Sequence, residues 1–411
     1  MCIRDRSNVW FTFDAIFDTV SIDVVTGGAY GSMRGQQISV WNADDAEVGC
    51  ANASDWFAGT LNLQIDTLTP GHTYWICVDD RRTSGTFSLC MDNVSELEYW
   101  AIADGNWNVA GNWSHTEGGS PASTTPGISS NVHIKGYSIT VSDAQSCANL
   151  DIEVQNDNTG LNIDGGNLNI HGDMSFINGG ANYRGTVNVQ NSGSVSINND
   201  LIIDRSGGTN TFQFELFDNS EMIIYNDVAV SSSAGSSSNV DFIMNGTAQF
   251  STGNDLLISN IGGPKVMITV NGNAIMDIDR HIDFNASGSG EIEIELNDNA
   301  VLSMAGNFNR GASDYGILDC NDNSTLLFNG QSFIQTLPQN NGGGTDDFTY
   351  QNITINNSKI TRPQIVLDGD VQINGTLTLT QGIVRSTSSN LLTIANNATV
   401  TGASSASYVY G

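Results

Sequence analysis

The sequence predicts an all-β protein in which a small, jelly-roll-like β-sandwich is followed by a right-handed parallel β-helix, a solenoid of stacked coils. Apolar and polar residues alternate over short runs, as in strands with one buried face. Asn, Asp and Gly separate these runs, and helical periodicity is almost absent. In addition, residues 185–335 repeat one unit of three strands and two turns, and a fixed period indicates stacked units that bury one another's apolar faces.

The first turn of each unit sets the expected register of this repeat. Steps of 27, 27, 26, 26 and 24 residues separate the aligned turn residues Asn191, Asp218, Asn245, Asn271, Asn297 and Asn321. In the unit at 266–284 we expect Val266, Ile268 and Val270 to point inward, and Met267 and Thr269 outward. Hairpins packed as a sandwich also place turns at short intervals, but they have no reason to keep this register. The repeat therefore favours a three-sided coil of about ten turns.

The charge balance excludes several classes of function. Lys and Arg total 14, Asp and Glu total 44, and the formal net charge is −30. We expect no binding to nucleic acid or to anionic membrane surfaces, and no membrane insertion. Ca²⁺ is compatible with such a surface, and no other cofactor is indicated. Many neutral polar residues and few charged ones are typical of secreted bacterial β proteins, which predicts an extracellular or cell-surface location.

Both ends of the sequence suggest a fragment. Residues 1–7, MCIRDRS, resemble a translated sequencing adapter, and the chain stops in mid-pattern at SSASYVYG. We therefore expect a solenoid truncated at its C-terminus, with other modules of the same longer chain as neighbours. Cys77 and Cys90 lie on successive strand-like runs, and they would form a disulfide in an oxidising compartment or remain buried thiols.

Residues 8–92 contain six or seven short strand-like runs, as a β-sandwich would. NVWFTF (8–13), ISVWNADD (38–45), PGHTYWICVDD (70–80) and GTFSLCM (85–91) resemble the bacterial pre-peptidase C-terminal domain and related carbohydrate-binding-like modules. The resemblance implies an accessory domain of a secreted protein, sometimes with bound calcium.

Acidic loop residues in this region are candidate calcium ligands. A Ca²⁺ site needs six to eight oxygens from convergent loops. The candidates are Asp44, Asp45, Asp79 and Asp80. The alternative is that these residues form turns by hydrogen bonding to their own backbone.

Tryptophans of the same region are candidate ligand-binding residues. Trp10, Trp41, Trp56 and Trp75 would include a stacking platform for a glycan if their rings were exposed, and Trp41, Trp56 and Trp75 are the preferred candidates. A tryptophan on an alternating strand also suits a buried core.

Residues 93–130 are expected to form a linker and a cap rich in tryptophan. Trp100, Trp107 and Trp113 precede a run rich in Gly, Ser, Thr and Pro. The G-x-W…W-S pattern resembles the segment before β-helical repeats in large secreted surface proteins. An open first coil exposes apolar side chains and unpaired strand edges, which bulky indoles would cover. An aromatic sugar site is the alternative.

Residues 131–411 are expected to form the solenoid, and a second ladder of polar residues runs through it. Asp173, Asp200, Asp227 and Asp255 each precede the apolar residue that opens a strand, and His281 and Asn307 take the equivalent places next. Stacked carboxylates repel one another unless they are solvated, hydrogen-bonded to amides or bridged by a cation. The ladder therefore accepts backbone N–H groups or holds a row of weak Ca²⁺ sites.

The densest group of ionisable residues is MDIDRHIDF, at 276–284. If it were one strand, Asp277, Asp279, His281 and Asp283 would share an outward face. Such a face would suit acid–base chemistry on a polysaccharide, as in a β-helix lyase or glycosidase. A single cluster without long flanking loops argues against a cleft, so we expect no catalytic residues and no enzyme.

The C-terminal region carries the most specific resemblance. FNGQSFIQTL (328–337), FTYQNITINNS (348–358), VQINGTLTLTQGIV (371–384) and LLTIANNATVTGASSASYV (391–409) resemble a recurring segment of type IX-secreted, adhesin-like surface proteins. The resemblance implies a structural or adhesive module, a stalk or spacer, whose partners would be extracellular glycans or protein surfaces. The alternatives are a polysaccharide-degrading enzyme and a glycan-binding N-terminal sandwich.

Overall fold

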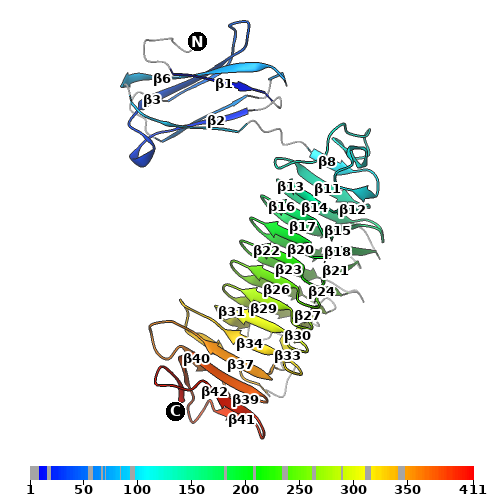
Figure 1. Ribbon diagram of the computed structural model, residues 1–411, viewed down its shortest axis with the longest axis vertical. Coiled ribbons are helices and arrows are strands. Elements are labelled where there is room, and N and C mark those ends of the chain that lie inside the picture. The colour runs from blue at the N-terminus through cyan, green and yellow to red at the C-terminus, as the bar shows by residue number, and fades with distance from the viewer. Residues whose placement is uncertain are drawn as a thin grey trace. The chain divides into compact units, whose positions relative to one another are not determined.

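The computed structural model describes residues 9–15, 20–53, 59–65, 68–69, 71–83, 85–92, 98–179, 183–206, 210–233, 239–261, 265–287, 290–310, 316–340 and 348–411. The chain divides into two compact units, Met1–Leu97 and Glu98–Gly411 (Figure 1). In the described residues the regular structure consists of strands and two single-turn 3₁₀ helices, Gly28–Tyr30 and Ala110–Asn112. The predicted all-β class is therefore confirmed.

The first unit contains two antiparallel sheets. One has the order β1 (Val9–Asp14), β6 (Thr73–Thr83), β3 (Arg34–Trp41) and β4 (Glu47–Asn52). The other has the order β5 (Thr60–Ile65), β2 (Val20–Val25) and β7 (Ser88–Asp92). Alternating residues of both sheets enter one buried cluster, among them Ile22 and Val24 of β2 and Ile38, Val40 and Ile76 of the larger sheet. The strands therefore have one core-facing side, as the alternation predicted.

The second unit is a parallel β-solenoid in which each coil adds a strand to each of three sheets (Figure 1). The first solenoid sheet contains β8 (Glu98–Ala101), β11 (Asn131–Lys135), β14 (Asn149–Val154), β17 (Met174–Asn178), β20 (Leu201–Ser206), β23 (Val228–Ser233), β26 (Leu256–Ile261), β29 (Ile282–Ser287) and β32 (Phe308–Arg310). The second contains β9 (Gly105–Asn106), β12 (Ser138–Val141), β15 (Gly160–Asp164), β18 (Arg184–Gln190), β21 (Thr211–Leu216), β24 (Val240–Met244), β27 (Val266–Val270), β30 (Ile292–Leu296), β33 (Gly316–Cys320) and β36 (Phe348–Thr349). The third contains β13 (Ala144–Cys147), β16 (Asn167–Ile170), β19 (Ser194–Ile197), β22 (Glu221–Ile224), β25 (Gln249–Thr252), β28 (Ile275–Ile278), β31 (Val301–Met304), β34 (Thr325–Phe328), β37 (Asn352–Asn356) and β40 (Thr376–Arg385).

The solenoid continues through the last described residues, as predicted. Strand β40 pairs in parallel with β38 (Ile365–Leu367), β42 (Thr399–Thr401) and β43 (Ser407–Tyr410). Strand β35 (Gln335–Leu337) pairs with β38, and β39 (Val371–Ile373) pairs with β41 (Leu392–Ile394). The strands of each coil therefore pair with those of the coil before it, as expected for a repeat protein.

Inward side chains stack from coil to coil to form the solenoid core. Val266, Ile268 and Val270 are almost completely buried, whereas Met267 and Thr269 are partly exposed, so the predicted orientation is confirmed. Burying one such side chain stabilises the fold by roughly 1.5–3 kcal/mol. Because each layer is covered only by its neighbours, the core exists only as a stack.

The turn between the second and third sheets corrects the predicted register. Each turn has a residue of positive φ at the same position, and these residues form a column: Asn191 (56°), Asp218 (54°), Gly246 (70°), Gly272 (73°), Asp298 (58°) and Asp322 (52°). In the first turn, Ser192 (62°) also has a positive φ. The pairing of Leu216 with Met244 confirms that Asp218 aligns with Gly246. The predicted alignment is therefore wrong by one residue from Asn245 onward. Asn and Gly both tolerate this conformation, so residue type alone did not distinguish the two positions.

Residues 98–130 are part of the solenoid unit and begin its first two sheets, with β10 (Trp113–Ser114) pairing antiparallel to β8. Trp107 and Trp113 are fully buried, with ring centroids 5.1 Å apart. The Trp113 Nε1–H donates to the Trp107 carbonyl oxygen at 2.7 Å. These indoles fill the end of the solenoid, as the cap hypothesis expects, and neither ring can stack on a sugar.

Candidate functional site

The four predicted calcium ligands of the first unit do not converge. Asp44 and Asp45 lie in the turn after β3, where the Asn42 Oδ1 accepts the backbone N–H of Asp44 at 3.0 Å. Asp79 and Asp80 are buried on β6, opposite the other end of β3. About four residues of extended strand, roughly 13 Å, separate the two pairs. One Ca²⁺ ion therefore cannot take ligands from both.

Two of the preferred tryptophans lie together. Trp41 on β3 is the cross-strand partner of Trp75 on β6, and both are partly exposed. The Trp41 Nε1–H donates to Ser39 Oγ at 2.8 Å, so its ring lies on the side opposite to Ile38 and Val40. Trp56 lies outside the described residues.

Trp10, another of the predicted tryptophans, joins this pair. It lies on β1 opposite Cys77, two residues along β6 from Trp75, and 40% of it is exposed. The alternation in NVWFTF carried the signal, because Phe11 and Phe13 occupy the other side of the strand. Trp10, Trp41 and Trp75 form the tryptophan face of the first unit.

Cys77 and Cys90 are not neighbours. Cys77 belongs to the four-stranded sheet and Cys90 to the three-stranded one. The idea of a cross-strand disulfide between adjacent strands is therefore wrong.

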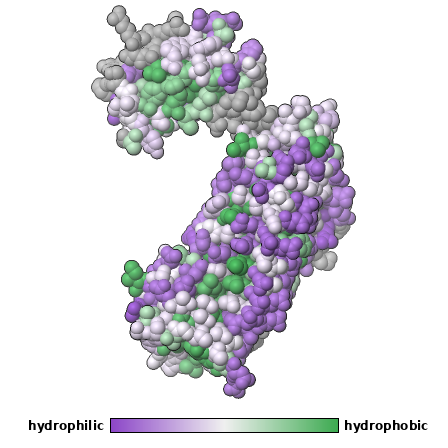
Figure 2. Space-filling model, in the orientation of Figure 1, coloured by the Kyte–Doolittle hydropathy of each residue, from purple (hydrophilic) through white to green (hydrophobic). Residues whose placement is uncertain are grey.

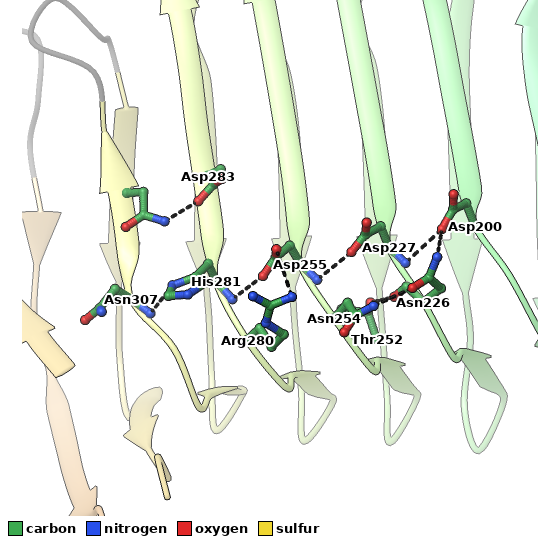
Figure 3. Close-up of polar contacts among 11 residues, drawn as sticks. Asp200, Asn226, Asp227, Thr252, Asn254, Asp255, Arg280, His281, Asp283 and Asn307 are labelled. Carbon is green, nitrogen blue, oxygen red and sulfur yellow. Dashed lines mark hydrogen bonds and ion pairs between the residues drawn. The ribbon is translucent and has the colours of Figure 1, made fainter. Parts of the chain in front are cut away.

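In the second unit, the predicted polar ladder bonds each coil to the next (Figure 3). It runs along the corner between the third and first sheets, and we call it the corner ladder. The Asp200 Oδ1 accepts the backbone N–H of Asp227 at 3.1 Å, and Asp227 accepts that of Asp255 at 3.0 Å. Asp255 accepts the N–H of His281 at 2.9 Å. These carboxylates act as backbone acceptors, one of the two roles expected from the sequence.

The ladder is longer than the sequence indicated. Asn149 precedes Asp173 as an acceptor (2.9 Å), Asp173 accepts from Asp200 (3.1 Å), and Asn307 accepts the N–H of Thr336 at 2.6 Å. Asn149 and Thr336 fall outside the regular spacing, which is why they were missed.

Further contacts offset the repulsion between stacked carboxylates. The Asn226 Nδ2 donates to Asp200 at 2.5 Å, and Arg280 Nη1 lies 3.7 Å from Asp255 Oδ2 (Figure 3). Both the Asn226 amide and the Arg280 guanidinium lower the negative potential at the ladder carboxylates. The Arg280–Asp255 pair lies at the surface and not in the core.

The predicted acid–base face at 277–283 is wrong. Strand β28 ends at Ile278 and β29 begins at Ile282 in a different sheet, so Asp277 and Asp283 lie on different sides of the coil. His281 faces the ladder, where its Nδ1 accepts the N–H of Asn307 at 3.0 Å. Asp283 accepts from Asn309 Nδ2 at 2.6 Å.

Asp277 and Asp279 alone remain close. Burial, followed by the charge of Asp277, raises the pKa of Asp279. The chain turns at 279–281 without a Gly or Pro, which is why this corner resembled a continuous strand.

A dense group of charged contacts among the described residues lies elsewhere, on the outward side of the first sheet. His133 on β11 bonds through Nε2 to Glu98 of β8 and lies 3.3 Å through Nδ1 from the Asp151 Oδ2 of β14. Its ring stacks on Trp100, with centroids 4.1 Å apart and planes at 19°. We call Glu98, Trp100, His133 and Asp151 the His133 cluster. Its members come from three strands, β8, β11 and β14, and only the coil register brings these strands together.

The electrostatics of this cluster follow from its contacts. Burial lowers the pKa of His133, but hydrogen bonds to Asp151 and Glu98 outweigh burial, and the net change is upward. The bond from His133 lowers the pKa of Asp151 against the effect of burial. Beside it, Lys135 Nζ lies 3.0 Å from Glu117 and 3.1 Å from Glu153. The arrangement holds the cap and the first two complete coils together by charge.

Surface character agrees with a solvated solenoid. The visible face of the second unit is mostly hydrophilic, with small separate apolar spots (Figure 2). Within the described ranges, no group of three or more His, Cys, Asp or Glu residues is placed to share a metal ion. No helix in the described part of the chain is long and apolar enough to span a membrane.

Comparison with protein-family models, with curated proteins and with solved structures finds no match to this chain.

Proposed function

We propose that this chain is an extracellular structural and adhesive module, a stalk or spacer of a large secreted bacterial surface protein, and not an enzyme. The corner ladder carries the proposal. From Asn149 to Thr336, one side chain per coil accepts a backbone N–H of the next coil. These polar residues hold neighbouring coils in register, so they serve the length and stiffness of the stack rather than a ligand.

The chemistry of the outward residues supports the same role. Acid–base hydrolysis needs a carboxylic acid and a second carboxylate facing each other across the substrate. Asp277 and Asp279 lie two residues apart at one edge of a single coil, while His281 and Asp283 are engaged in bonds to the next coil. Asp277 and Asp279 therefore cannot face a substrate from two sides, which favours a structural role over that of a lyase or glycosidase.

Location and context come from the sequence. The resemblance of 328–411 to type IX-secreted, adhesin-like proteins supports secretion to the cell surface, and the charge of −30 disfavours nucleic acid and anionic membranes as partners. Extracellular glycans and protein surfaces are the proposed partners.

A direct test separates the stalk from the enzyme. The whole chain, coupled to beads, is expected to retain the beads on glycan- or protein-coated surfaces under flow. It is also expected to release no reducing ends from polysaccharides. Reducing-end release that disappears in an Asp277→Asn, Asp279→Asn double variant would overturn the proposal in favour of catalysis.

The tryptophan face favours a second function, glycan binding by the first unit. Three indoles on neighbouring strands, outside the core, suit stacking on sugar rings. A Trp41→Ala, Trp75→Ala variant of the whole chain is expected to lose glycan-array signal. An unchanged array profile would refute this second function.

A further inference from the structure

A polar groove runs along the corner between the second and third solenoid sheets. It has a volume of about 700 Å³, and the turn residues of four consecutive coils line it. It lies at a different corner from the corner ladder, which connects the third sheet to the first. Neither the proposed stalk role nor the tryptophan face accounts for it.

The groove has a local cause in the column of positive-φ residues. Asn191 and Asp218 occupy this column in two coils, and Gly246 and Gly272 occupy it in the next two. The column returns to side-chain-bearing Asp298 in the following coil. A Cβ at Gly272 would lie 2.8 Å from the Gly246 carbonyl oxygen. The two glycines therefore leave the floor of the groove without side chains, while Asn and Asp close its ends.

The groove cannot bind a peptide by adding a strand, because its backbone groups are already bonded from coil to coil. The Thr247 N–H donates to the Asp218 carbonyl oxygen at 2.9 Å, and the Asn273 N–H donates to that of Gly246 at 2.7 Å. Strand addition needs an exposed edge with unpaired N–H and C=O groups. Recognition here must therefore come from side chains.

The side chains offer both donors and acceptors. Among the described residues, no partner is present for the Ser192 hydroxyl, the Asn191 Oδ1, the Asp218 carboxylate or the Asn273 Nδ2, although Asn273 Oδ1 accepts from Asn299 at 3.1 Å. The lining contains one carboxylate, no Lys or Arg, and no large apolar side chain. A ligand that fits must be polar, hydroxyl-rich and free of negative charge.

We infer that this groove binds a linear neutral oligosaccharide lying along the solenoid axis. The coils advance by about 4.8 Å each, which is close to the advance per sugar of an extended pyranose chain, so successive sugars would meet successive turns. The net charge of −30 and the carboxylate of Asp218 oppose acidic polysaccharides. The groove is shallow and has no aromatic ring, so one site binds weakly and adhesion would depend on many copies. This inference rests on the proposed adhesive role for its ligand class.

The test uses the whole chain and three neutral probes, cellohexaose, mannohexaose and xylohexaose, with hexagalacturonate as the acidic comparison. Binding is followed by titration calorimetry or ligand-observed NMR. An Asn273→Trp variant fills the groove. Asn323→Trp is the matched control, because Asn323 takes the same turn position in a coil beyond the groove and bonds to Asn299 at 2.8 Å. Asn323 also accepts from Asn352 Nδ2 at 3.2 Å, whereas Asn273 accepts only from Asn299 among the described residues, so Asn323→Trp should lower the melting temperature at least as much as Asn273→Trp.

We expect at least one neutral hexaose to bind, a loss of roughly tenfold or more in affinity for Asn273→Trp, and a change within about twofold for Asn323→Trp. Three results would overturn the inference: no saturable binding of any neutral hexaose, stronger binding of hexagalacturonate, or equal losses in the two variants. Loss of hexaose binding in the Trp41→Ala, Trp75→Ala variant, together with normal binding in Asn273→Trp, would also refute binding at the groove. The proposed adhesive role would stand in that case. Retention of beads on protein-coated surfaces tests the stalk role separately.

Discussion

The Nδ1 of His281 accepts the backbone N–H of Asn307 at 3.0 Å, in the ladder position that aspartates occupy in the preceding coils. An imidazole nitrogen can replace a carboxylate oxygen here because the ladder requires an acceptor and not a charge. His281 also contacts the ring of Phe333 at 4.9 Å, which fixes its orientation.

Replacing His281 tests that requirement. His281→Asn should keep the acceptor, as Asn149 and Asn307 do, and should change the free energy of unfolding little. His281→Ala leaves the partly buried N–H of Asn307 without its partner and should cost about 1–2 kcal/mol. Hydrogen exchange of the Asn307 amide gives a local measure: faster exchange in the Ala variant alone is expected, and equal exchange in both variants would contradict the ladder.

Asp227 tests whether the ladder carboxylates serve as acceptors or as cation ligands. Asp227→Asn keeps an oxygen for the Asp255 N–H and removes a charge about 4.8 Å from its neighbours. The variant should therefore be as stable as the wild type or slightly more so, whereas Asp227→Ala should lose about 1 kcal/mol. EDTA should leave the melting temperature unchanged. A marked fall with EDTA, abolished by Asp227→Asn, would instead establish bound cations.

The His133 cluster should make the attachment of the cap depend on pH. Because the folded pKa of His133 is raised, its contribution is fully present below the unfolded pKa and is lost as pH rises through the raised value. Because the pKa of Asp151 is lowered, its contribution is present above the unfolded pKa and is lost as pH falls through the lowered value. The cap should therefore be most stable between these two limits.

The difference in tryptophan fluorescence between the wild type and a Trp100→Phe variant isolates the signal of Trp100, which stacks on His133, and reports this window during melting at different pH values. His133→Gln should flatten the alkaline side of the profile. Lys135→Met should leave the shape unchanged over the pH range in which His133 titrates, because its hydrogen bonds to Glu117 and Glu153 raise the pKa of Lys135 further above that range. Since Glu98 and Asp151 are nearly half exposed, salt should reduce the effect. A profile that is the same in His133→Gln and the wild type would contradict the assignment.

The strands were predictable because burial imposes a period of two residues, and Val266, Ile268 and Val270 show it directly. The turn register was less predictable, because Asn and Gly are interchangeable at positive φ. The step from Asp218 to Gly246 is one residue longer than the alignment assumed. The ladder was found because its members recur at the coil period.

The candidate sites were harder to predict, because local sequence does not show where a strand stops. Asp277 and Asp283 were placed on one face, although the chain turns between them. Glu98 and His133, 35 residues apart, meet only through the pairing of β8 with β11, which follows from the coil register and not from any motif. The spacing of residues along the coils therefore predicted which residues form the ladder. The contacts between the cap and the coils could not be predicted from the sequence.

Trp113 provides a test of the cap itself. Its ring is fully buried against Trp107 and Tyr99, so Trp113→Ala leaves a cavity and should cost about 3–5 kcal/mol. Trp113→Phe fills much of the space but removes the N–H donor to the Trp107 carbonyl oxygen, and a loss of about 1–3 kcal/mol from that unpaired group is expected in addition to the smaller volume. Trp100→Ala is the matched control on the outward face and should cost less than either.

If the cap protects the open end of the stack, Trp113→Ala should also accelerate exchange of the Ile139 and Val141 amides in β12, which pairs with β9 next to Trp107. Loss of stability without faster exchange in β12 would mean that the indoles stabilise only their own loop.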